Sequence, residues 1–411
     1  MRRTSAVTGE VWHHGEMAIT ADIVVVGLGA VGSAALYQTA KLGAKVIGID
    51  RFVPPHDQGS SHGETRITRQ AIGEGREFVP LVLRSNQIWA ELEAATGRRL
   101  LTPNGGLLLA SEGIHGSHHG SNAFLAETID AAKSFGIPHE QLTTDEIRQR
   151  YPQFELTAGE RGYFEPGAGF LRPEACVETQ IARAQQLGAR LFTSETVRAL
   201  SQKTGAVEVT TNQATYSASK VILTPGPWIS RFLPPEYASN FLVYRQTLCW
   251  FALKQNSDHY TPKRFPIFIW ITGNELEDML YGFPAVDGPD GGIKVATESY
   301  EDTLDPDRVP RDVSDESVAR MYSHYIASRL PDVSRLCLRT ATCLYTVTPD
   351  AKFVIDYVDE HQNILFASAC SGHGFKHSPA VGEALAQQAL GIRPQLDLSA
   401  FRLDRLKKAQ A

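Results

Sequence analysis

The stretch ADIVVVGLGAVG, residues 21–32, joins a strand directly to a glycine-rich turn. Residues 21–26 show no polar alternation, which predicts a strand buried on both faces, as in a parallel sheet. The pattern G-x-G-x-x-G follows at Gly27, Gly29 and Gly32. Such a turn allows a tight bend, close approach of a pyrophosphate and close packing of helix on strand. The start of the next helix would then face the phosphates.

The residues after this turn complete a βαβ unit. An alanine-rich helix is predicted from about residue 31 to residue 42, Gly43 ends it, and residues 45–50 form a second strand. Asp50 ends that strand, where a carboxylate can accept the hydroxyls of an unphosphorylated ribose. This order predicts a bound dinucleotide but does not separate FAD from NAD. We expect the dinucleotide to contact Gly27, Gly29, Ala30, Val31, Gly32, Asp50 and Arg51.

Length and composition set the class of protein. A chain of 411 residues is too long for one ordinary core and suits two domains. Its 42% hydrophobic and 21% charged content is typical of a soluble globular protein. A net charge of -6 argues against a nucleic-acid surface. No apolar run approaches the roughly 20 residues that span a bilayer, so no membrane segment is expected.

The cysteines indicate a reducing compartment. Five are scattered along the chain, without the pairing of a disulfide framework or the spacing of a zinc site. We therefore expect a cytoplasmic protein with no metal. Residues 1–19 lack an apolar core and are read as a loose tail rather than a signal peptide.

The pattern changes along the chain in a way that predicts two sheets. An apolar strand at residues 220–226 ends in a glycine turn, and another strand is predicted at residues 364–369. Between about residues 241 and 295, aromatic-rich strands indicate a second, sheet-based domain. The predicted fold class is α/β.

Several short motifs, in order, carry a family resemblance. They are PPH at residues 54–56, SHGETR at 61–66, GEGRE at 73–77, FEP at 164–166, YGFP at 281–284 and SGHGFK at 371–376. With them, the chain from about residue 22 to residue 405 resembles the monomeric sarcosine oxidase family, which includes N-methyl-tryptophan oxidase. That family lies within the D-amino-acid-oxidase-like flavoproteins.

The resemblance implies a particular domain organisation. A discontinuous, Rossmann-like FAD-binding domain would comprise residues 20–100, 163–238 and 340–411. Residues 101–162 and 239–339 would form a substrate domain on a mixed or antiparallel sheet. The family also implies a monomer.

The resemblance assigns roles to several cations. Arg69 and Lys376 would hold the substrate carboxylate, for which the planar fork of an arginine is well suited. Lys294, with Arg66 as a second cation beside the flavin, would activate oxygen, because a fixed cation stabilises the superoxide that electron transfer creates. Tyr281 would line the substrate pocket. From the sequence alone, Lys294 and Lys376 read as ordinary solvated lysines.

The resemblance also implies the surroundings of the flavin and a covalent bond. Cys343 matches the family cysteine that bonds to the flavin 8-methyl carbon, although a free cysteine is usually a small buried hydrophobe. Cys337 is its nearest competitor in the sequence. The other residues expected near FAD are His62, Thr65, Arg66, Val197, Gly226, Trp228, Gly372, His373, Gly374, Phe375 and Lys376.

One residue departs from the family. Glu298 stands where well-known members carry a histidine in the substrate pocket, and an acid changes charge and hydrogen bonding there. The natural amine therefore stays open. His118 and His119, in a Gly/His/Ser-rich stretch, are expected to be exposed.

The implied reaction is oxidation of a secondary amine of an amino acid, either N-methylated or cyclic. Hydride transfer to flavin N5 gives an imine that water hydrolyses, and O2 is reduced to H2O2. The expected partners are thus a small amine and O2. A flavin dehydrogenase that uses a non-oxygen acceptor and a non-catalytic FAD-binding protein remain as alternatives.

Overall fold

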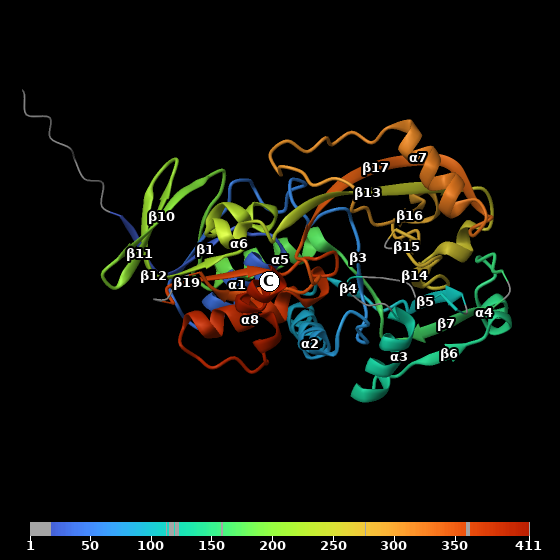
Figure 1. The fold of residues 1–411 in the computed structure, drawn as a ribbon, viewed down its shortest axis with the longest axis horizontal. Coiled ribbons are helices and arrows are strands. Elements are labelled where there is room, and N and C mark those ends of the chain that lie inside the picture. The colour runs from blue at the N-terminus through green and yellow to red at the C-terminus, as the bar shows by residue number, and fades with distance from the viewer. Residues whose placement is uncertain are drawn as a thin grey trace, which may run out of the picture.

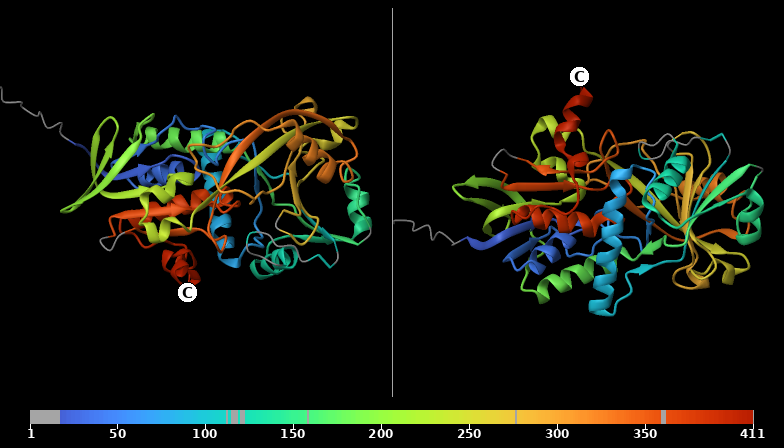
Figure 2. Two further views of the ribbon diagram at one scale, coloured as in Figure 1. Left: turned by 45° about the horizontal axis from the view of Figure 1, so that its top comes forward. Right: turned by 90° about the horizontal axis from the view of Figure 1, so that it is seen from below.

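The computed structural model describes residues 18–111, 113–114, 119, 123–157, 159–275, 277–358 and 362–410. Two eight-stranded sheets form the two halves of the molecule (Figure 1). Helix α2 (Val79–Thr96) crosses the junction between the halves (Figure 2). Of the expected loose tail, residues 1–17 lie outside the described residues, and Ile19 already begins strand β1.

The first sheet contains the predicted βαβ unit. Its parallel core has β1 between β2 and β12, with β9 beyond β2 and β19 beyond β12. Strands β10, β11 and β18 are antiparallel additions. The bounds are β1 (Ile19–Val26), β2 (Val46–Ile49), β9 (Arg190–Phe192), β10 (Val197–Lys203), β11 (Ala206–Thr211), β12 (Thr215–Leu223), β18 (Val354–Tyr357) and β19 (Ile364–Ser368).

Both faces of strand β1 are buried over residues 23–26, as the apolar sequence there predicts. Ile23 and Val25 belong to the core under helices α1 (Ala30–Lys41), α5 (Pro173–Gln186) and α8 (Ser378–Ala389). Val24 and Val26 belong to a separate core on the other face. Helix α1 therefore starts at the carboxyl end of β1, where ligands bind in open α/β sheets.

The second sheet is mixed. Its order is β17-β13-β16-β15-β14-β5-β7-β6, and every pair is antiparallel except β5 with β14. The bounds are β5 (Gly106–Ser111), β6 (Glu140–Leu142), β7 (Glu160–Glu165), β13 (Leu242–Leu253), β14 (Ile267–Ile271), β15 (Met279–Phe283), β16 (Ile293–Ala296) and β17 (Val333–Val347). Shorter elements complete the chain: α3 (Phe124–Phe135), α4 (Thr144–Arg150), α6 (Pro235–Ala238), α7 (Asp315–Met321), and a small sheet of β3 (Arg66–Thr68), β4 (Leu101–Thr102) and β8 (Gly169–Leu171).

Two of the expected domain boundaries fall inside strands of this second sheet. The boundary at 162/163 lies within β7, and the boundary at 339/340 lies within β17. Strands β13 and β17 are long and arch toward the first sheet (Figure 1). Residues at the end of β17 therefore reach the junction. Among the described residues, no helix is both long and apolar enough to cross a bilayer.

Close contact between α1 and α8 brings the glycine turn beside the start of α8. At Gly382, an added Cβ atom would overlap the Cβ atom of Ala34 on α1. The glycine in the middle of α8 thus permits a helix–helix approach that a larger residue would prevent.

We predict that Gly382→Ala destabilises the protein by about 1–3 kcal/mol through overpacking. This is opposite to the gain of about 1 kcal/mol that alanine gives inside an exposed helix. Thermal or denaturant unfolding measures the change. The double variant Ala34→Gly/Gly382→Ala should recover part of the loss, whereas a stabilised Gly382→Ala protein would show that the contact is not tight.

Candidate active site

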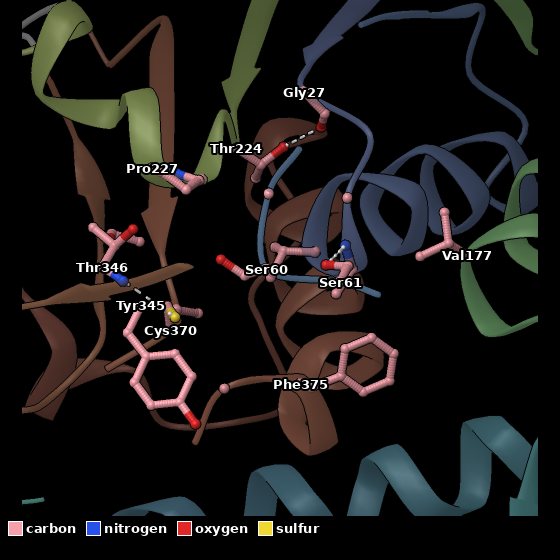
Figure 3. A pocket seen from close by; sticks show the side chains of 18 of the residues that line it. Gly27, Ser60, Ser61, Val177, Thr224, Pro227, Tyr345, Thr346, Cys370 and Phe375 are labelled. Carbon is pink, nitrogen blue, oxygen red and sulfur yellow. Dashed lines mark hydrogen bonds between the residues drawn. The ribbon is translucent and has the colours of Figure 1, made fainter. Parts of the chain in front are cut away.

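A long cleft begins at the carboxyl ends of the parallel strands and continues to the second sheet. Its lining includes the turn at residues 27–31 at one end and Lys294, Glu298 and Lys376 at the other. Figure 3 shows Gly27 and Thr224 joined across the top of the cleft, with Tyr345, Cys370 and Phe375 around its lower part. The cleft therefore brings together segments that are far apart in the sequence.

The glycine turn has the geometry that its sequence predicts. Gly27 has φ +86°, a conformation that favours glycine, and its carbonyl accepts a hydrogen bond from Thr224 Oγ1 at 2.8 Å. A Cβ atom at Gly32 would overlap the carbonyl oxygen of Gly27. At Gly29, by contrast, the nearest atom to an added Cβ is Ser61 Oγ at 3.4 Å. Gly32 thus serves the packing of the turn, and Gly29 leaves the approach to the helix start open.

Asp50 lines the cleft and also supports the turn. Its carboxylate accepts hydrogen bonds from the backbone nitrogens of Leu28 at 2.6 Å and Phe52 at 2.7 Å. Ala30, Val31, Val197 and Gly226 line the same end of the cleft. These two hydrogen bonds fix the Asp50 carboxylate, which is predicted to bind the ribose.

The two expected cofactor residues Arg51 and Trp228 also line the cleft, but their polar atoms bind Asp307. Arg51 Nη1 donates to Asp307 Oδ1 at 2.6 Å, and Trp228 Nε1 donates to the same oxygen at 2.8 Å. Arg231 donates to the other oxygen at 2.7 Å. No local sequence pattern predicts this link, because Asp307 is far from Arg51 and Trp228 along the chain.

Two cations, Arg66 within the loop of residues 60–66 and Lys294 on β16, bind carbonyl oxygens of this loop. Lys294 Nζ donates to the carbonyl oxygens of Gly63 at 2.9 Å and Thr65 at 2.7 Å. Arg66 donates to the carbonyls of Ser60 and Thr65, each at 2.8 Å. The rings of Phe283 and Trp250 lie 4.1 Å and 5.7 Å from Lys294 Nζ. The ammonium group is thus held by backbone oxygens and aromatic faces.

Burial dominates the electrostatics of Lys294. Its side chain is only 2% exposed, and burial, helped by the nearby charge of Arg66, brings its pKa well below the usual value. A lysine in such a place is costly for folding, because a charge must lose its water. From the sequence alone, Lys294 was predicted to be solvated. This prediction is wrong, because the side chain is buried.

Arg69, Glu74 and Lys376 form a second charged group. Arg69 Nη2 donates to Glu74 Oε2 at 2.5 Å, and Lys376 Nζ lies 3.9 Å from Glu74 Oε1. Burial alone would raise the pKa of Glu74, but Arg69 and Lys376 hold it well below its usual range. Burial lowers the pKa of Lys376 to about 7, although Glu74 opposes the shift. The structure thus brings together the two cations that were predicted as a pair, and it adds an acid between them.

The two histidines predicted near the cofactor are buried and neutral at physiological pH. Burial, and then the charge of Arg66, lowers the pKa of His62 to about 4. Burial also takes the pKa of His373 well below its usual value. His373 lines the cleft together with Gly372, Gly374 and Phe375, whereas His62 lies behind the lining. Neither imidazole is poised as a general base at neutral pH.

The cysteines differ in their relation to the cleft. Cys343 is 1% exposed and packs in a small core with Tyr345 and Cys370. Cys370 lines the cleft itself, whereas Cys337 is a partly exposed free thiol on β17, with its Sγ 3.2 Å from the carbonyl oxygen of Arg339. Burial raises the pKa of the Cys343 thiol, and the charge of Arg66 opposes that shift. Cys343 and Cys370 are therefore the two thiols near the cleft.

The part of the cleft near Glu298 was only partly predicted. Glu298 lines the cleft at 4% exposure, and its Oε2 accepts a hydrogen bond from the Tyr300 hydroxyl at 2.6 Å. His119 Nε2 lies 3.0 Å from Glu298 Oε1. The expected exposure of His119 is wrong, since it is only 6% exposed, and His118 lies outside the described residues. The composition of the loop predicted exposure of His119, because its acidic partner Glu298 is far away in the sequence.

Several buried polar atoms along the cleft could form hydrogen bonds with a ligand. Within the described part of the chain, four lining atoms have no protein partner: Thr65 Oγ1, Arg69 Nε, Thr346 Oγ1 and His373 Nδ1. Buried polar groups rarely stay unpaired, because each costs about 1–3 kcal/mol. The same described residues contain no cluster of three side chains suited to a metal ion.

Comparison with known proteins identifies the family. Residues 22–388 match the model of the family described as DAO, FAD dependent oxidoreductase. The chain belongs to this family of FAD-dependent oxidoreductases. A monomeric sarcosine oxidase of Streptomyces avermitilis is 35% identical over 96% of this chain and 100% of its own length. An N-methyl-L-tryptophan oxidase of Yersinia pestis is 33% identical over 94% of this chain and 99% of its own.

Solved structures of other proteins share the fold. NikD, an unusual amino acid oxidase of nikkomycin biosynthesis, aligns with a TM-score of 0.80 at 24% identity, over 94% of this chain and 98% of its own. An L-proline dehydrogenase from P. horikoshii aligns with a TM-score of 0.78 at 20% identity, over 96% of this chain and 99% of its own.

The residues of the cleft fit FAD. The glycine turn leaves room for a pyrophosphate at Gly29, and Asp50 stands at the end of the second strand. Farther along, the unpaired atoms of Thr65, Thr346 and His373 supply hydrogen-bonding groups for a polar ring system. The individual contacts that the sequence predicts for FAD stay predictions.

We predict that Gly29→Ala lowers flavin content while leaving the fold intact. The added methyl group has space in the protein itself, but it points to where the pyrophosphate must approach. Flavin per protein and the melting temperature of the flavin-free protein measure the two effects. Gly32→Ala is the matched variant, and it should destabilise the flavin-free protein as well. Full flavin content in Gly29→Ala would contradict the predicted position of the pyrophosphate.

We also predict pH-dependent binding of small carboxylates in the cleft. Since the pKa of Lys376 is about 7, its charge is present at lower pH and is lost as the pH rises through that value. The dissociation constant of propanoate, measured by calorimetry on the flavin-loaded protein, should rise about tenfold or more from about pH 6 to about pH 9. Lys376→Met should bind propanoate weakly with a flat profile. A flat profile in the unmodified protein would contradict this role of Lys376.

Proposed function

We propose that the protein is an oxidase of secondary amines of amino acids, N-methylated or cyclic, that reduces O2 to H2O2. The main support is that Arg69 and Lys376 lie in one cleft with Lys294 and Arg66 and with the glycine turn. The first pair suits a carboxylate, and the second pair suits negative charge that develops during electron transfer. The names of the relatives, sarcosine oxidase and N-methyl-L-tryptophan oxidase, support the same substrate class.

The substrate carboxylate binds between Arg69 and Lys376. Arg69 Nη2 donates to Glu74 Oε2, so a substrate carboxylate would share or replace this acidic partner. The exchange of one carboxylate for another keeps the charge of the buried site nearly balanced, which limits its cost. Both cations then orient the amino acid in the cleft.

Lys294 and Arg66 support the oxygen half of the reaction. The two-electron chemistry between the carbon beside the amine nitrogen and O2 would be supplied by bound FAD. Arg66 supplies fixed positive charge, and negative charge that develops beside Lys294 favours the protonated form of its amine in this buried site, where charge acts strongly. Tyr281 lines the same part of the cleft and limits the space beside the substrate.

An anaerobic titration tests the proposed function. The flavin-loaded protein is mixed with sarcosine, other N-methylated amino acids, proline and pipecolate, and the flavin absorbance is followed. At least one of these amines should bleach the flavin, and admission of O2 should restore the colour with release of about one H2O2 per flavin. Bleaching by none of the secondary amines would contradict the proposal.

The same experiment separates the oxidase from the alternative dehydrogenase. A dehydrogenase would be bleached by substrate but would recover its colour slowly in O2 and quickly with an artificial acceptor. The buried Lys294 favours the oxidase, since a dehydrogenase has no need of a cation that stabilises superoxide.

We further propose a covalent bond between FAD and Cys343 and a monomeric, cytoplasmic protein. Arg66 lies close enough to Cys343 to oppose the rise of its thiol pKa, and positive charge favours the thiolate that must attack. The names of two relatives, each a monomeric sarcosine oxidase, support a monomer. The free cysteines are consistent with a reducing compartment.

We predict that Lys294→Met slows reoxidation of the reduced flavin by about tenfold or more, with a much smaller effect on its reduction. Stopped-flow absorbance measures both half-reactions on one preparation, so each serves as the control for the other. Equal slowing of the two would assign Lys294 a structural role through the loop carbonyls that it binds.

We predict that the flavin of the unmodified protein stays with the precipitate in acid, whereas that of Cys343→Ser is released. Cys370→Ser is the matched control, because Cys370 is the other thiol near the cleft and should not affect retention. Retention in Cys343→Ser together with release in Cys370→Ser would move the bond to Cys370.

A further inference from the structure

The end of the cleft beside Glu298 combines one carboxylate with several phenols. Glu298 follows β16 and lies four residues beyond Lys294, and both side chains line the cleft. Tyr281 and Tyr345 line the cleft as well. Glu298 lines the same cleft as both phenols and Lys376, and its charge acts on all three groups.

The carboxylate of Glu298 is held in a fixed orientation. Tyr300 donates to one oxygen at 2.6 Å, and His119 lies 3.0 Å from the other. Tyr300 is itself fixed by an edge contact with Tyr244, with ring centroids 5.5 Å apart. A carboxylate offers about four acceptor positions, so Glu298 can keep these contacts and still accept from a ligand.

A buried carboxylate among aromatic rings suits a cationic ligand. The carboxylate supplies a charge-assisted hydrogen bond, and the ring faces attract positive charge. Glu298 lies close to Lys376, where the substrate carboxylate is proposed to bind. A ligand held there by its carboxylate would bring its other end within reach of Glu298.

We propose that Glu298, held by Tyr300 and His119, is a specificity-determining residue that selects amino acids with a second cationic group. This inference rests on the proposed function, because the carboxylate site at Arg69 and Lys376 fixes the orientation of the ligand. It assigns the substrate class as an N-alkylated or cyclic amino acid whose remaining end carries an amine or guanidine. Neutral amino acids such as sarcosine leave Glu298 without this partner.

Binding of matched carboxylates tests the proposal without relying on turnover. 5-Aminopentanoate and hexanoate have nearly the same shape and differ in a terminal cation. Calorimetry under anaerobic conditions on the flavin-loaded protein should give at least about tenfold tighter binding of 5-aminopentanoate. Glu298→Gln keeps the size of the side chain and removes its charge, and it should abolish this preference while hexanoate binds as before or more tightly.

Two further variants separate a local effect from a structural one. Tyr300→Phe keeps the charge of Glu298 but removes the hydroxyl that holds it, so the preference should fall only in part. Glu301→Gln removes the same charge from an exposed position nearby and should leave the preference unchanged. The melting temperature of each variant checks its fold.

The outcomes distinguish this proposal from the proposed function. Equal binding of the two ligands by the unmodified protein, or a preference that survives in Glu298→Gln, would overturn the role of Glu298 and leave the carboxylate site intact. Failure of both ligands to bind would overturn the carboxylate site and this proposal together. If 5-aminopentanoate binds more tightly as predicted, an N-methylated diamino acid should also bleach the flavin faster than its neutral isostere.

Discussion

The contact of the Lys294 ammonium group with two carbonyl oxygens of the loop at residues 60–66 underlies the arrangement of the site. Lys294 belongs to the second sheet, whereas the loop follows the βαβ unit of the first. A buried ammonium needs oxygen partners, and these oxygens are supplied only when the loop has its observed shape. Positive φ angles at Gly63 and Glu64 allow that shape. The two halves of the molecule are therefore tied together at the place where the chemistry is proposed.

The loop is also held from its other sides. Glu174, at the start of α5, accepts hydrogen bonds from the backbone nitrogens of Gly63 at 2.6 Å and Glu64 at 3.1 Å. The side chain of Glu64 binds Trp250 on β13 and Arg339 on β17. This short loop thus has partners on four elements. Because these contacts fix the loop, they also fix the positions of Arg66 and Lys294.

Local patterns in the sequence predicted the parts of the fold that local physics determines. The apolar run before Gly27, the glycine turn and Asp50 specified the βαβ unit, and the structure confirms it. The mixed second sheet was predicted only as a change in composition, because the pairing of strands such as β5 and β14 depends on residues far apart in the chain. Two domain boundaries were placed inside strands for the same reason, since β17 continues from one half of the molecule toward the other.

Burial of charge was the least predictable feature of the site. Lys376 and Lys294 read as solvated lysines until the family resemblance was considered, yet both are almost fully buried. The pairing of Arg51 and Trp228 with Asp307, and of His119 with Glu298, joins residues that no local pattern connects. Such contacts follow from the tertiary fold, so motif matching can name the residues but not their partners.

A crystal structure of the flavin-loaded protein with bound propanoate tests the central claim most directly, namely that one cleft holds both the cofactor ring and the substrate carboxylate. We predict the propanoate carboxylate between Arg69 and Lys376, with Glu74 drawn away from Arg69, and the flavin ring beside Lys294 and Arg66. A flavin ring remote from Lys294, or propanoate bound elsewhere while the Arg69–Glu74 contact stays intact, would contradict that claim.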